Sequence, residues 1–135
     1  MRLIFAALLL AGCPTVDDDT ATLDCDAMAY ASVQVDIVDL LGDPLAITSL
    51  SYSVDGGEAE DAFCDDGDSC STWIPSWEQA GVFDITASYY APDPEDEHCW
   101  YTDVATAQVT VTKGLCHVET QMLTIQLDTT LLVCE

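Results

Sequence analysis

Val33-Gln34-Val35-Asp36-Ile37 is the stretch that decides the fold, because its apolar and polar residues alternate strictly. A period of two places the three apolar side chains on one face of an extended strand and the polar pair on the other. The same period returns in Phe83-Asp84-Ile85-Thr86-Ala87-Ser88-Tyr89. The sequence therefore predicts half-buried β-strands on both sides of its centre.

Further strands are expected around these two stretches. Alternating apolar residues over 50–54, 105–111 and 123–127 predict three more strands, and 59–64 and 70–74 predict two weaker ones. Gly42-Asp43-Pro44 and Asp55-Gly56-Gly57 are turn signals between strands. Several short strands separated by turns, with no sustained helical period, are typical of an all-β antiparallel sandwich. We expect this domain to occupy residues 31–135.

Two parts of the expected sandwich resemble a known family. Val35-Asp36-Ile37-Val38-Asp39, followed by Gly42-Asp43-Pro44-Leu45, is similar to the first strand and turn of carboxypeptidase regulatory-like, transthyretin-like domains. Residues 109–114, Cys116-His117-Val118 and 123–127 resemble the closing hairpin of such domains in exported bacterial lipoproteins. The resemblance implies a structural or accessory module without catalytic residues. An immunoglobulin-like topology is the alternative.

The first residues have the pattern of an export signal. Arg2 precedes the apolar run 3–10, which is shorter than the about 20 apolar residues that span a bilayer. The run ends in Leu10-Ala11-Gly12-Cys13, which resembles the lipobox of bacterial lipoprotein signal peptides. That resemblance implies removal of residues 1–12, transfer of diacylglycerol to the Cys13 thiol, and acylation of the new amino group with a fatty acid such as palmitate. The alternative is an ordinary secretory signal with a chance cysteine at the cleavage site.

Residues 13–30 are expected to form an acidic flexible tether, because they contain Asp17-Asp18-Asp19 and few apolar residues to bury. Pro14 follows the cysteine, where Asp commonly signals retention in the inner membrane in the lipoprotein family. The resemblance therefore implies a lipid anchor in the bacterial outer membrane. It leaves open whether the protein faces the periplasm or the exterior.

The charge of the chain excludes some partners. It has 25 acidic residues, two basic residues and a formal net charge of −23. Loss of Arg2 with the signal peptide would leave Lys113 as the only basic side chain. Nucleic acid is thereby excluded, because phosphate binding needs clustered Lys and Arg. An anionic lipid surface is disfavoured for the same reason, so we expect membrane attachment only through the acyl chains at Cys13.

The cysteines indicate an oxidising compartment. Besides Cys13 the chain has an even set, which fits three disulfides in an exported domain: Cys25, Cys64, Cys70, Cys99, Cys116 and Cys134. The cysteine count alone does not fix the pairing. The preferred set is Cys64–Cys70, which closes a short Gly-containing loop, Cys99–Cys116, and Cys25–Cys134, which would fasten both ends of the domain.

The loop between Cys64 and Cys70 is the candidate metal site. Asp65, Asp66 and Asp68 could offer carboxylate oxygens to calcium. Their spacing differs from the alternating acidic pattern of an EF-hand loop, and no Glu stands at the distal position. Like charges 4 Å apart in water repel by only about 1 kcal/mol, so the loop can stay solvated without a cation. We expect no cofactor, with calcium as the alternative.

The aromatic candidates for ligand contact are Trp73, Trp77, Trp100 and Tyr101. Exposed Trp and Tyr side chains can stack on sugar rings or on a partner protein, although they more often belong to a core or an interface. Because Tyr89-Tyr90 and Trp100-Tyr101 are neighbours in the sequence, alternation along a strand predicts that one residue of each pair faces outward.

Enzymatic activity is not expected. The sequence has neither a G-x-S-x-G nor an H-E-x-x-H motif, and cysteine nucleophiles would be consumed by disulfides. The sequence therefore predicts a lipid-anchored envelope protein whose sandwich is a non-catalytic structural or interaction module for another envelope protein. The alternative is a calcium- or carbohydrate-binding envelope module.

Overall fold

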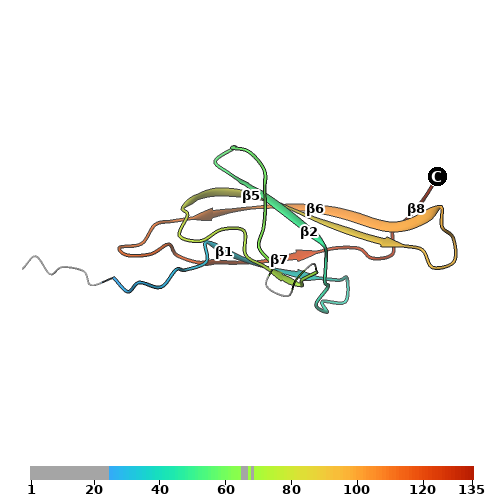
Figure 1. Cartoon of the computed structure of the whole chain (residues 1–135), viewed down its shortest axis with the longest axis horizontal. Helices are drawn as coiled ribbons and strands as arrows, with labels where there is room; N and C mark the ends of the chain where they lie inside the picture. Colours follow the sequence, from blue (N-terminus) through green and yellow to red (C-terminus); the bar gives the residue numbers. More distant parts are fainter. Residues whose placement is uncertain (1–24, 65–66, 68) are drawn as a thin grey trace, which may run out of the picture.

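The computed structural model describes residues 25–64, 67 and 69–135, and they fold into two β-sheets that share one apolar core (Figure 1). The strands are β1 (Val33–Val38), β2 (Ser49–Val54), β3 (Glu60–Asp61), β4 (Thr72–Trp73), β5 (Gly81–Pro92), β6 (Cys99–Val111), β7 (Gln121–Gln126) and β8 (Leu132–Cys134). One sheet has the order β4-β1-β7 and the other the order β3-β2-β5-β6-β8. The prediction of an all-β domain is confirmed, and none of the described residues is helical.

Alternating burial explains the strands and the core. Val33, Val35 and Ile37 of β1 are buried, while Gln34 and Asp36 between them are partly exposed. Phe83, Ile85 and Ala87 of β5 are buried in the same way on the facing sheet. Each fully buried Val, Ile or Phe side chain contributes roughly 1.5–3 kcal/mol to folding. The two stretches in which the sequence shows alternation therefore lie on opposite sides of one core.

The expectation of a purely antiparallel sandwich is wrong in one place. β1 pairs in parallel with β7, from Val33 beside Gln121 to Val38 beside Gln126. Every other strand pair is antiparallel. A parallel pair needs a long crossover connection. Here the chain between β1 and β7 forms β4 of the first sheet and every strand of the second sheet except β8, which follows β7.

The weaker predicted strands are shorter than expected. Only Glu60–Asp61 and Thr72–Trp73 form ladders in the segments 59–64 and 70–74. Phe63 instead forms an isolated bridge with Ile74, because the chain leaves β3 and turns away from β2 after residue 62. The short C-terminal strand β8, which the sequence did not predict, pairs with the start of β6.

The turn signals are confirmed. Asp55 and Gly56 both have positive φ angles, 52° and 73°, as a tight hairpin turn requires. Position 81 also requires glycine. Its φ is 143°, and a Cβ atom there would lie 2.7 Å from Val54 Cγ1. This close approach brings the start of β5 against the Asp55 turn, where Asp55 Oδ1 accepts a hydrogen bond from the Val82 amide.

The long hairpin of β5 and β6 gives the domain its elongated shape. The two strands pair continuously from Gly81 beside Val111 to Pro92 beside Trp100. Figure 1 shows the first described residues at the left end of the long axis, and the tip of this hairpin with β8 at the right end. We call the end that carries residues 92–100 and β8 the distal end.

Candidate functional site

The three disulfides correct most of the preferred pairing. Cys64–Cys70 is confirmed, whereas Cys99 pairs with Cys134 and Cys25 with Cys116. The predicted Cys99–Cys116 and Cys25–Cys134 bridges are therefore wrong. The reason is the length of β6, which carries Cys99 to the distal end beside β8 and leaves Cys116 in the turn at the opposite end.

The N-terminal segment 25–30 is fastened to the domain at this opposite end. Besides the Cys25–Cys116 bridge, the Tyr30 amide donates a 2.7 Å hydrogen bond to Glu78 Oε1. The Tyr30 ring lies 4.4 Å from the His117 ring, centroid to centroid, and its hydroxyl donates to Asp26 Oδ2. Residues 25–30 belong to the segment for which the sequence predicts a flexible tether. Cys13 and the rest of the tether up to residue 24 lie outside the described residues.

His117 connects two carboxylates in this region. Its Nδ1 lies 2.6 Å from Glu78 Oε1, and its Nε2 lies 2.9 Å from Asp26 Oδ1 without an aligned hydrogen bond, so the second contact is electrostatic. Burial opposes the charged imidazolium, but Glu78 and Asp26 outweigh it and raise the pKa of His117. Burial would also raise the pKa of Glu78, but the Tyr30 amide, His117 and the Val118 amide together lower it. The cluster therefore favours a protonated His117 between ionised carboxylates.

The candidate calcium ligands belong to the loop between Cys64 and Cys70. Asp65, Asp66 and Asp68 lie outside the described residues, although the Cys64–Cys70 bridge on either side of them is formed. Within the described ranges, no group of three or more His, Cys, Asp or Glu side chains converges as a metal site would require.

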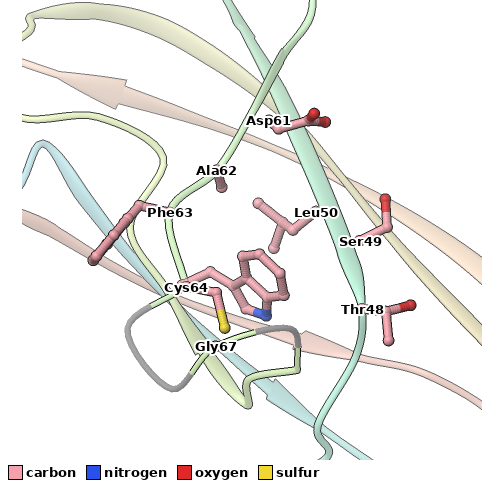
Figure 2. Close-up of a pocket in the computed structure, with 9 residues that line it drawn as sticks. Thr48, Ser49, Leu50, Asp61, Ala62, Phe63, Cys64 and Gly67 are labelled. Carbon is pink, nitrogen blue, oxygen red and sulfur yellow. The ribbon is translucent and has the colours of Figure 1, made fainter.

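A groove of about 500 Å³ lies where the chain passes from β3 toward the other sheet (Figure 2). It is lined by Thr48, Ser49, Leu50, Asp61, Ala62, Phe63, Cys64, Gly67 and Trp73. Its size is in the range of small-ligand sites, and its hydroxyls and carboxylate could hydrogen-bond a polar ligand. Figure 2 shows Phe63 pointing away from Leu50 and Ala62, and the Trp73 side chain is almost fully buried, so the groove offers little aromatic surface for stacking.

The four aromatic candidates have different environments. Trp73 belongs to the core, and its indole Nε1 donates to the Cys70 carbonyl. Trp77 is half exposed near the N-terminal segment, where it bridges to Ala31. Trp100 and Tyr101 are half-buried near the distal end. The structure therefore does not bring the four side chains into one site.

One exposed aromatic surface lies on the outer face of the distal end, where the sequence predicted no joint site. Ile85 and Ala87 face the core, so Tyr90 on β5 must face outward, and 61 % of it is exposed. Its ring lies 6.4 Å from that of Trp100, which is directly paired with Val133 of β8. Val104 continues this face along β6. We call Tyr90, Trp100, Val104 and Val133 the distal patch.

The prediction that one residue of each adjacent aromatic pair faces outward is confirmed for Tyr89-Tyr90, since Tyr89 packs against the core. Elsewhere on this outer face, β5 and β6 present mainly polar residues such as Asp84, Thr86 and Gln108. On this face, the exposed large apolar residues of β5 and β6, Tyr90 and Val104, thus lie toward the distal end. The signal that could have located the patch is the loss of alternation after Tyr89, where apolar residues continue on both faces.

The described part of the chain contains no helix long and apolar enough to cross a membrane. Comparison of the chain with protein-family models, with curated proteins and with solved structures finds no match.

Proposed function

We propose that this chain is a lipid-anchored lipoprotein of the bacterial outer membrane, whose β-sandwich is a non-catalytic interaction module that contacts another envelope protein. The anchor would be acylated Cys13, after removal of residues 1–12. The proposal includes a transthyretin-like sandwich topology, with an immunoglobulin-like one as the alternative. Three disulfides among the described cysteines support passage through an oxidising compartment.

The placement of the two ends of the domain is the observation that carries this proposal. Segment 25–30, which leads from Cys13, is fastened at one end of the long axis. The distal patch lies at the other end, where Tyr90 and Val104 are each about 60 % exposed. A protein tethered at the first end would hold the second end away from the bilayer. Exposed apolar side chains gathered in one place mark interaction surfaces.

Site-specific photocrosslinking in cells tests this function. A benzophenone amino acid would replace Tyr90 in the distal patch or, as the control, Met122, which is 63 % exposed on β7. We expect a specific envelope protein to crosslink at position 90, not at position 122, and only when Cys13 is intact. Absence of any specific crosslink at position 90, or an unchanged crosslink after Cys13→Ser, would contradict the proposal.

Carbohydrate binding is the second candidate, and the groove beside Asp61 is the observation that favours it. Thr48, Ser49 and Asp61 provide hydrogen-bonding groups at its margin. Titration of the mature chain with a defined oligosaccharide, followed by amide chemical shifts, tests this function. Shifts confined to groove residues and lost in Asp61→Asn would support it, and unchanged spectra at millimolar sugar would exclude that sugar.

A further inference from the structure

The distal patch combines apolar surface with an excess of negative charge. The loop between β5 and β6, residues 93–98, contains Asp93, Glu95, Asp96 and Glu97 and leads directly into Trp100. Asp93 and Asp96 each cap a backbone amide within the loop. Glu95 and Glu97 are exposed, and the contact made by Glu97 is a loose 3.8 Å approach to His98.

Among the described residues, no Lys or Arg side chain pairs with these carboxylates. The chain has only two basic residues, Arg2 and Lys113, and Lys113 follows β6 at the end opposite to the distal patch. Apart from the loose contact between Glu97 and His98, these carboxylates therefore have no ion pair within the described residues. A partner that supplies positive charge would gain this interaction without displacing an existing pair.

The charge of the whole chain restricts what can cover the patch. A second copy would bring a further formal charge of −23, and an anionic lipid surface or nucleic acid would be repelled in the same way. A cationic partner is attracted over a long range, which raises its rate of encounter. At contact, the faces of Tyr90 and Trp100 can hold an Arg or Lys side chain through cation–π interaction.

We propose that the distal patch binds a cationic segment of a partner protein, in which Arg or Lys side chains alternate with apolar ones. The apolar side chains of the segment cover Val104 and Val133, and its basic side chains reach the rings and the carboxylates of the 93–98 loop. This inference rests on the proposed function and specifies the partner of the same surface.

Binding of a defined peptide to the mature, acylated chain in neutral detergent tests the inference. The probe is a capped hexapeptide of alternating arginine and leucine, titrated at 150 mM salt and followed by amide chemical shifts and calorimetry. We expect the shifts to cluster at positions 90, 100, 104 and 133. Tyr90→Ala should weaken binding by about two- to fivefold, which is the value of an exposed cation–π contact. The equally exposed Met122→Ala should leave affinity unchanged.

Matched charge variants distinguish specific binding at the distal patch from general electrostatic attraction to an acidic protein. Glu95→Gln with Glu97→Gln and, as the control, Asp43→Asn with Glu58→Gln each remove two exposed carboxylates. The first pair should weaken binding at least threefold more than the second. Equal losses, shifts spread over the whole surface, or unchanged affinity in Tyr90→Ala would overturn the inference.

Two further outcomes distinguish this inference from the function on which it rests. If sedimentation shows a dimer of the chain that Tyr90→Ala dissociates, the patch is a self-interface and the inference is wrong. If crosslinking at position 90 captures an envelope protein whose contacting segment lacks Arg and Lys, the interaction function stands and the cationic partner is refuted. A captured segment rich in Arg or Lys supports both.

Discussion

Removal of the disulfides one at a time should destabilise the domain in the order of the loops they close. The bridges span sequence separations of 91 residues for Cys25–Cys116, 35 for Cys99–Cys134 and 6 for Cys64–Cys70. In the chain-entropy account, a cross-link stabilises the fold by restricting the unfolded chain. For these separations, removal of the bridge should lower the free energy of unfolding by about 4.6, 3.8 and 2.2 kcal/mol, respectively. Total stability of a domain this size is about 5–15 kcal/mol, so the first two losses are large.

The first two values are upper bounds, because both bridges hold terminal segments. Without Cys25–Cys116, segment 25–30 can detach in the folded protein and regain roughly 1 kcal/mol or more of backbone entropy for each freed residue. The contacts of Tyr30 and His117 with Glu78 oppose this detachment. A measured cost near the full value therefore indicates that these contacts hold the segment without the disulfide.

The assay is urea unfolding of the chain from residue 13 onward, with Cys13→Ser and each cysteine pair replaced by alanine. Fluorescence and circular dichroism should give coincident transitions. The dependence of the free energy on urea should steepen when the longest loop is opened, because the unfolded chain then exposes more surface. A larger loss of stability without Cys64–Cys70 than without Cys25–Cys116 would refute the loop-entropy reasoning for this domain.

Three other changes have defined outcomes. Because its pKa is raised, His117 stabilises the folded state fully at pH values below its usual pKa of about 6.5, and this stabilisation is lost as pH rises through the raised pKa. Because its pKa is lowered, Glu78 contributes stabilisation that is lost only in more acidic solution. Protection of the Tyr30 amide from hydrogen exchange, corrected for intrinsic rates, should therefore fall between pH 5.5 and pH 8.5, and the same fall in His117→Gln would contradict this assignment. Phe83→Ala leaves a cavity at a fully buried site and should lower the free energy of unfolding in urea by about 3–5 kcal/mol. Val104→Ala on the outer face should change it by less than about 0.5 kcal/mol. Similar losses in the two variants would show that the core is misassigned. Millimolar calcium should raise the melting temperature no more than magnesium does at equal ionic strength, because we expect the loop between Cys64 and Cys70 to remain solvated. A rise that only calcium produces would instead establish a calcium site.

The strands could be predicted because their signal is local. The alternation in 33–37 and 83–89 depends only on which face of each strand is buried, and the structure has both strands in those places. Cys64–Cys70 was predictable for the same reason, since a short loop brings the two cysteines together. Strand β8 was not, because it is short and exposed on both faces, and its position depends on pairing with distant β6.

The pairing of strands and cysteines that are far apart in the sequence could not be predicted, for a physical reason. The parallel register of β1 and β7, and the Cys25–Cys116 and Cys99–Cys134 bridges, depend on how far the β5–β6 hairpin extends. Alternation gives the face of each residue but not the partner of the strand. The ionic cluster around His117 was missed likewise, since its partner Glu78 is 39 residues away in the sequence.

Intact mass spectrometry of the native protein from membrane fractions tests the lipid anchor, on which the proposed function depends. The account predicts a chain that begins at Cys13, carries diacylglyceryl and amide-linked acyl groups there, and has its other six cysteines oxidised. A chain that retains Met1, or one with an unmodified Cys13, would contradict it.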